Sequence, residues 1–102
     1  MIFFNDDPNR RLRRERMVEA RRKGMHTKEQ WETLKAFCQF ECARCGAWPV
    51  CKDHIQPICA GGSDHIENIQ PLCVRCNSRK DVRDQLDYRP DGWREAVYGA
   101  VQ

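Results

Sequence analysis

Two Cys-x-x-Cys pairs constrain the fold of this chain more than any other feature of its sequence. The first pair is Cys42 and Cys45, and the second is Cys73 and Cys76. Two intervening residues let both thiolates of a pair point into one coordination sphere, and four thiolates form a closed tetrahedral set that suits zinc. The 27 residues between the pairs exceed the roughly 15–20 of a plain zinc ribbon. The sequence therefore predicts a structural zinc site that encloses a loop with chemistry of its own.

The enclosed loop and its flanks carry a polar motif with fixed spacing. The motif reads Asp53-His54-Ile55-x-Pro57, Gly61-Gly62-Ser63-Asp64, Asn68 and Leu72-Cys73-x-x-Cys76-Asn77-x-x-Lys80. This run resembles the signature of the HNH nucleases, in the variant whose third position is asparagine. The resemblance covers about 40 of the 102 residues and implies His54, Asn68 and Asn77 as the motif residues.

The resemblance also implies a fold. It predicts a small α+β protein with a ββα-metal (His-Me finger) unit, a four-cysteine structural zinc site and flanking helices. We expect a basic N-terminal arm over residues 1–26 and a nuclease domain over residues 27–102, with its zinc and catalytic core at 42–84. At this length a single hydrophobic core is thin, and a bound metal adds stability that packing alone does not supply.

The motif offers the groups that phosphodiester hydrolysis needs. An imidazole has an ordinary pKa of about 6.5 and accepts a proton from water at neutral pH, which indicates His54 as general base. Mg²⁺ and Mn²⁺ prefer oxygen ligands, and Asp53 and Asn77 offer a carboxylate and an amide oxygen. The resemblance implies this allocation. We expect Asn68 to hydrogen-bond across the loop and hold the backbone and ring of His54. His65 also lies on this loop and is a further candidate for the site. Adjacent strand residues point to opposite faces, so Asp53 and His54 share a site only where the strand bends.

Capping residues and hydrophobic spacing predict the remaining elements. Thr27 and Gln30 have the spacing of a capping box. Trp31, Leu34 and Phe37 or Cys38 mark the buried face of the helix that follows. The first expected helix runs from Pro8 to about Lys23; Asp6 or Asp7 caps it and Gly24 ends it. A second helix over 28–39, strands over 50–58 and 69–72, and a third helix over 74–84 follow. A last helix is expected from Asp91 to about Tyr98, with Trp93 and Val97 facing inward.

Basic residues are concentrated at the N-terminus. The chain has 18 basic and 15 acidic residues, and nine of the basic against four of the acidic lie in residues 1–28. A basic arm on a near-neutral body favours a polyanionic partner, although a solvated helix face has the same composition. Arg75, Arg79 and Arg83 would form a second basic stripe on one helix face. The residues expected to contact the phosphates of double-stranded DNA are Arg10, Arg11, Arg13, Arg14, Arg75, Arg79, Lys80 and Arg83.

The remaining sequence features bear on compartment and on competing functions. No apolar stretch is long enough to span a membrane, and no secretory leader is visible, so we expect a cytoplasmic protein with reduced thiols. Of the remaining cysteines, we expect Cys38 to pack in the core and assign no role to Cys51 and Cys59. The favoured function is a metal-dependent DNA endonuclease with low intrinsic sequence specificity, using structural Zn²⁺ and catalytic Mg²⁺ or Mn²⁺. Resemblance to small stand-alone phage HNH proteins implies a targeting partner such as the phage packaging machinery. The alternative is a non-catalytic zinc module that binds nucleic acid or protein.

Overall fold

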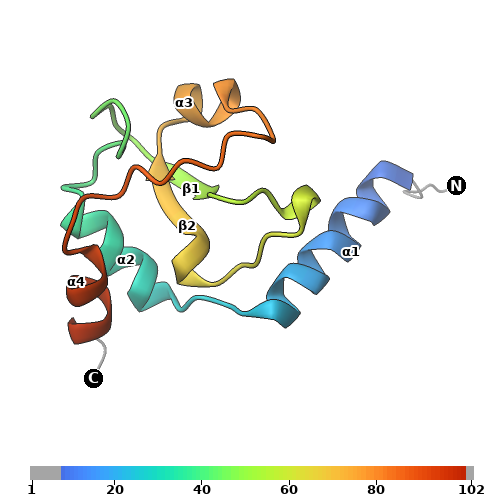
Figure 1. Cartoon of the computed structure of the whole chain (residues 1–102), viewed down its shortest axis with the longest axis horizontal. Helices are drawn as coiled ribbons and strands as arrows, with labels where there is room; N and C mark the ends of the chain where they lie inside the picture. The colour runs from blue at the N-terminus through green and yellow to red at the C-terminus, as the bar shows by residue number, and fades with distance from the viewer. Residues whose placement is uncertain (1–7, 101–102) are drawn as a thin grey trace, which may run out of the picture.

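The computed structural model describes residues 8–100 of the chain, so the expected caps Asp6 and Asp7 lie outside the described residues. In this part of the chain two helices precede the antiparallel strands, two short 3-10 turns lie between the strands, and two helices follow them (Figure 1). The elements are α1 (Pro8–Lys23), α2 (Lys28–Phe37), β1 (Cys51–His54), η1 (Ile58–Ala60), η2 (Ile66–Asn68), β2 (Ile69–Leu72), α3 (Val74–Arg79) and α4 (Trp93–Ala100).

The centre of the molecule is a ββα unit. Strands β1 and β2 pair antiparallel, with Asp53 opposite Gln70 and His54 opposite Ile69. Strand β2 leads through Cys73 directly into α3, whose first turn Cys73 caps by accepting a hydrogen bond from the Cys76 backbone N–H. The predicted small α+β fold with a ββα unit is therefore confirmed.

The main hydrophobic core lies between β2 and a pair of helices. Helices α2 and α4 lie side by side and cover this end of the sheet (Figure 1). The predicted capping box starts α2, because the Gln30 N–H donates to Thr27 Oγ1 at 3.0 Å while the Thr27 N–H donates to Gln30 Oε1 at 2.9 Å. The core residues are Trp31, Leu34, Ile66, Ile69, Trp93 and Val97.

Two elements are shorter than the sequence predicted. The strand expected over 50–58 ends at His54, because the chain turns there toward Pro57 and η1. The helix expected over 74–84 ends at Arg79, because Lys80 is extended (ψ 129°) and its side chain turns into the interior. Arg83 therefore lies in a turn, where it donates to Asp81, and the predicted stripe on one helix face is wrong at that position.

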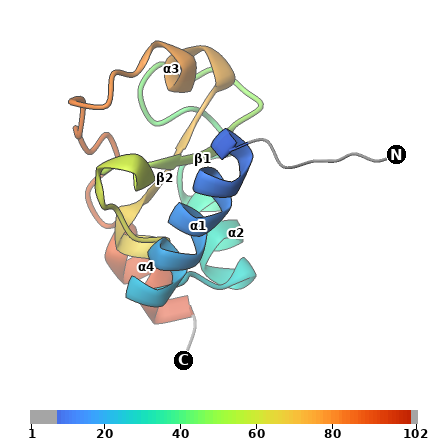
Figure 2. The same cartoon turned by 90° about the vertical axis from the view of Figure 1, so that its right-hand side faces the viewer.

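Helix α1 extends from one side of the body and is attached through its C-terminal end (Figure 1). Lys23 Nζ donates to the carbonyl of Gly61 at 2.8 Å, and the backbone N–H of Asp64 donates to the carbonyl of Ala20 at 3.2 Å. In the view turned by 90°, α1 lies in front of the sheet and of helices α2 and α4 (Figure 2). The basic helix is thus joined to the loop that follows η1.

Within residues 8–100, none of the helices combines the length and the apolar character that crossing a bilayer requires.

Candidate active site and metal centre

The four predicted zinc ligands converge on one point. The Sγ atoms of Cys42, Cys45, Cys73 and Cys76 all lie within 4.8 Å of one another, and those of Cys45 and Cys73 are 3.7 Å apart. Zn–S bonds of about 2.3 Å in a tetrahedron place sulfur atoms about 3.8 Å apart. The donor type, number and spacing therefore fit a zinc ion, and these four cysteines are positioned to hold a metal.

The protein prepares part of this set as thiolates. Burial raises the pKa of Cys42, but hydrogen bonds from backbone groups, that of Cys73 first, outweigh it and lower the pKa to about 6. A backbone hydrogen bond from Cys76 lowers the pKa of Cys73 as well. Burial and the neighbouring sulfurs raise the pKa of Cys76 to about 12. A bound cation would favour the thiolate form of all four cysteines, because each thiolate is a zinc ligand.

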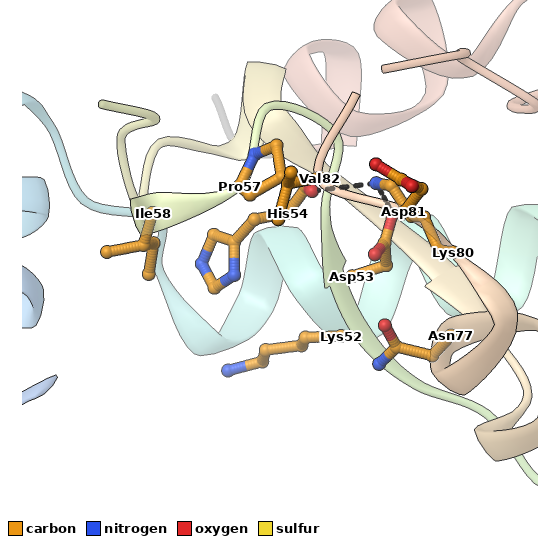
Figure 3. Close-up of a pocket in the computed structure, with 9 residues that line it drawn as sticks. All are labelled: Lys52, Asp53, His54, Pro57, Ile58, Asn77, Lys80, Asp81 and Val82. Atoms are coloured by element: carbon orange, nitrogen blue, oxygen red, sulfur yellow. Dashed lines mark hydrogen bonds and ion pairs between the residues drawn. The ribbon is translucent and has the colours of Figure 1, made fainter. Parts of the chain in front are cut away.

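A cavity of about 260 Å³ beside the ββα unit brings together the predicted general base and the two predicted metal ligands (Figure 3). Asp53, His54 and Asn77 all line it, although they come from β1 and α3. Asn68 and His65 are not among the lining residues. The cavity is lined by Lys52, Asp53, His54, Pro57, Ile58, Asn77, Lys80, Asp81 and Val82.

A bend at the end of β1 lets two adjacent residues share this cavity. Successive carbonyls of a regular strand point in opposite directions. Here the carbonyls of His54 and Ile55 both accept hydrogen bonds from Lys80 Nζ, at 2.9 and 3.1 Å. The backbone must therefore curve around the ammonium group, and this curvature brings Asp53 and His54 to one cavity.

Asp53 and Asn77 present oxygen atoms to the cavity. The Asp53 carboxylate is 4% exposed, and its Oδ2 accepts from Lys80 Nζ at 2.7 Å and from Gln70 Nε2 at 2.9 Å. Its Oδ1 accepts no hydrogen bond from the described residues. The Asn77 amide donates through Nδ2 to Cys51 Sγ at 3.4 Å, and its oxygen is turned toward Asp53 (Figure 3). A carboxylate and an amide oxygen are ligands that Mg²⁺ and Mn²⁺ accept, so the donor chemistry fits such an ion.

The structure corrects the role expected for Lys80. Its side chain is only 5% exposed, and the three hydrogen bonds to Asp53, His54 and Ile55 use all three ammonium hydrogens. A group satisfied in this way has no donor left for a DNA phosphate. Lys80 instead fixes the bend of β1 and the carboxylate of Asp53.

Asn68 supports the loop rather than facing the cavity. Its Oδ1 accepts from the Gln56 N–H at 2.8 Å, and its Nδ2 donates to the carbonyls of Gln56 and Ser63 at 3.0 and 2.7 Å. The loop crosses itself so tightly here that a Cβ on Gly62 would lie 1.9 Å from the Gln56 carbonyl oxygen. Asn68 thus closes the hairpin two residues after His54, while the expected hold on the His54 ring stays a prediction.

His54 has a partner that the sequence reasoning did not assign. Its Nε2 lies 2.9 Å from Asp64 Oδ1, and Asp64 is buried. Cys51 and Gln70 were also missed, although one orients Asn77 and the other Asp53. Only Asp64 had a signal in the sequence, because it belongs to the conspicuous Gly61-Gly62-Ser63-Asp64 run of the motif.

Exposed basic residues lie on α3 and on α1. Arg75 and Arg79 are exposed on α3. A groove between α1 and η1, lined by Arg13, Arg16, Met17, Ile58 and Cys59, shares Ile58 with the cavity. The exposed arginines of α1 therefore continue the surface that the cavity opens onto.

One of three comparisons with known proteins gives a match, and it lies in the central region. Residues 38–83 match the family model described as HNH endonuclease. This segment contains all four cysteines, both strands, α3 and the whole cavity-lining set. Comparison with curated proteins and with solved structures finds no match.

Proposed function

We propose that this chain, which carries an HNH endonuclease domain over residues 38–83, is a divalent-metal-dependent endonuclease that hydrolyses phosphodiester bonds in duplex DNA. One observation carries the proposal. An imidazole and two oxygen donors, from His54, Asp53 and Asn77, meet in one cavity of about 260 Å³, which accommodates a phosphate group and a water molecule.

The proposed roles follow from what each side chain presents. His54 accepts a proton from the attacking water through Nδ1, since its Nε2 is engaged with Asp64. Asp53 and Asn77 would hold a Mg²⁺ or Mn²⁺ ion through their oxygens, and when bound this ion supplies positive charge to the phosphate and the leaving oxygen. Lys80 keeps the Asp53 carboxylate in place, and Cys51 keeps the amide of Asn77 turned.

The positions of the basic side chains support a duplex substrate that runs along α1. Helix α1 carries eight basic and two acidic residues over its 16 positions. Since the α1 groove and the cavity share Ile58, a duplex whose phosphate enters the cavity also meets the arginines of α1. Contacts of this kind bind phosphates regardless of sequence, so we propose low intrinsic specificity and a targeting protein, such as phage packaging machinery, that directs the cut.

The direct test is cleavage of supercoiled plasmid DNA by the zinc-loaded protein with added Mg²⁺ or Mn²⁺. We expect nicking that His54→Ala and Asn77→Ala each reduce at least about 100-fold, as expected for loss of a general base or a metal ligand. Gln85→Ala is the matched control, because Gln85 is an exposed polar residue outside the cavity. Nicking that survives in His54→Ala would refute the assignment of the base.

The same assay separates the alternative function. A non-catalytic zinc module needs only the four cysteines and the basic surface. It would bind DNA or protein with no dependence on Mg²⁺ or Mn²⁺, and His54→Ala and Asn77→Ala would then behave as the wild type in a binding assay. Wild-type protein that binds plasmid but leaves it supercoiled at every metal concentration would favour this alternative.

A further inference from the structure

Asp64 is a buried carboxylate that contacts the proposed general base from outside the cavity. The residue is 7% exposed and does not line the cavity. Its Oδ1 lies 2.9 Å from His54 Nε2 and 3.7 Å from His26 Nδ1, and its Oδ2 lies 3.8 Å from Arg21 Nε. The strongest of these contacts is the one with the imidazole that faces the cavity.

We propose that Asp64 is the positioning residue of His54, an inference that rests on the proposed function. An ionised carboxylate only accepts hydrogen bonds, so the imidazole nitrogen that faces it must carry the proton. In the neutral ring the proton on Nε2 leaves the lone pair on Nδ1, and Nδ1 is then the atom that accepts a proton from water. The Asp64 carboxylate thus selects the tautomer and fixes the ring plane.

Asp64 itself is held by the segment that joins α1 to α2. Its backbone N–H donates to the carbonyl of Ala20, and its carbonyl accepts from His26 Nδ1 at 2.7 Å. Met25 forms an isolated parallel bridge with Asp64. The carboxylate therefore belongs to a hydrogen-bonded junction between the basic helix and the hairpin loop.

A purely structural role for Asp64 makes a different prediction. In that case its removal would lower stability while the ring of His54 kept its tautomer and the folded fraction kept its kcat. If Asp64 positions the ring, its removal must change the tautomer of the His54 imidazole. The two roles are therefore separated by a readout on His54 that does not depend on cleavage.

The first measurement is the nitrogen NMR spectrum of the His54 ring in the zinc-loaded full chain, at alkaline pH where the ring is neutral. We expect wild type to show only the Nε2–H tautomer and Asp64→Ala to show a mixture in which the Nδ1–H form is detectable. Asp64→Asn, a smaller change for use if Asp64→Ala fails to fold, should show the same loss because its amide can donate to the ring. A His54 ring that stays in the Nε2–H form in the folded variant would overturn the proposal.

The second measurement is plasmid nicking with saturating Mg²⁺. We expect Asp64→Ala to lower kcat about 10–100-fold, the usual effect of removing a residue that orients a reacting group, with KM changed less than about threefold. Asp64→Glu should recover part of the loss, and Asp91→Ala, which removes an exposed carboxylate, should match wild type. An unchanged kcat in folded Asp64→Ala would overturn the proposal. If wild type cleaves no DNA, the proposed function fails, whereas the tautomer of His54 still decides whether Asp64 orients the ring.

Discussion

Lys80 places its ammonium nitrogen 2.7 Å from Oδ2 of Asp53, and the two side chains are 5% and 4% exposed. The pair joins the end of α3 to the bend of β1. It also partly neutralises the carboxylate before any cation binds, so the oxygen that remains for a metal is Oδ1. The proposed metal site is thus built around an internal cation that holds one of its ligands.

Replacing Lys80 by methionine should destabilise the fold strongly. The substitution leaves the Asp53 carboxylate buried without its charge partner, and breaking such a pair costs about 3–5 kcal/mol. Urea unfolding of the zinc-loaded protein measures the change. Arg83→Met is the control: it removes one member of an exposed ion pair with Asp81 and should leave the free energy of unfolding unchanged. Equal unfolding midpoints for Lys80→Met and wild type would contradict the buried-pair interpretation.

Replacing Cys76 by serine should remove the zinc and most of the tertiary structure around it. The second buried cluster consists of Leu72, Cys42, Cys73 and Cys76, so little hydrophobic packing remains there without the metal. Structural zinc contributes about 10–16 kcal/mol in small domains, comparable to the whole stability of a chain of this size. Metal analysis and thermal unfolding are the measurements, with Cys59→Ser, at an exposed position outside the quartet, as control. Wild-type melting in zinc-free Cys76→Ser would show that the metal is not structural.

The sequence was most informative where one local signal determines one local structure. The capping box of Thr27 and Gln30, the end of α1 before Gly24 and the convergence of four cysteines depend on short spacings, and the structure has all of them. Lys80 shows the limit of this reasoning. Its position suggested an exposed helical turn, but its hydrogen bonds to Asp53 and to the β1 backbone end the helix, and such long-range contacts have no sequence signature.

The residues that hold the site residues in place were not assigned these roles from the sequence, although Asp64 lies in the Gly61-Gly62-Ser63-Asp64 run. Asp64, Gln70 and Cys51 each touch a proposed functional residue across 10 to 26 positions of chain. Their roles arise from the register of β1 against β2 and from the path of the loop, neither of which periodicity reveals. The short length of β1 has the same origin, because the hydrogen bonds of Asn68 and Lys80 bend the chain where its composition favours a continued strand.

Replacing Arg89 by lysine should loosen the turn that carries Asn68. The guanidinium side chain is 3% exposed, donates to the carbonyls of Ile66, Glu67 and Ile69, and stacks 3.8 Å from the ring centre of Trp93. An ammonium group cannot reproduce this planar fork, and we expect a loss of about 2–4 kcal/mol.

Urea unfolding measures the cost of Arg89→Lys, and hydrogen exchange at the Asn68 amide locates it. Arg79→Lys, at an exposed position on α3, is the matched control and should unfold as wild type does. Unchanged exchange at Asn68 would mean that the guanidinium contacts do not stabilise this turn.

Stability should fall on acidification in part through Glu67. Burial raises the pKa of this carboxyl, but hydrogen bonds from Arg94 and Tyr98 outweigh it and lower the pKa below its ordinary value of 4.5. A lowered pKa in the folded state stabilises the protein above pH 4.5, and this contribution disappears as the pH falls through the folded-state value. Melting temperatures of wild type and Glu67→Gln should therefore differ most near neutral pH and converge in acid. Glu41→Gln, which removes an exposed carboxylate, is the control, and a difference that grows in acid would contradict the assignment.

Lys52 should supply the phosphate contact that Lys80 cannot. Lys52 is exposed and lines the cavity beside His54 and Asn77. A lysine that binds one phosphate contributes about 0.9 to the slope of log affinity against log salt concentration. In a His54→Ala background, which prevents cleavage, Lys52→Gln should weaken duplex binding and reduce this slope by about one. Lys28→Gln, at an exposed lysine outside the cavity, should keep the wild-type slope. An unchanged slope in Lys52→Gln would mean that the phosphate does not enter the cavity from the side on which Lys52 lies.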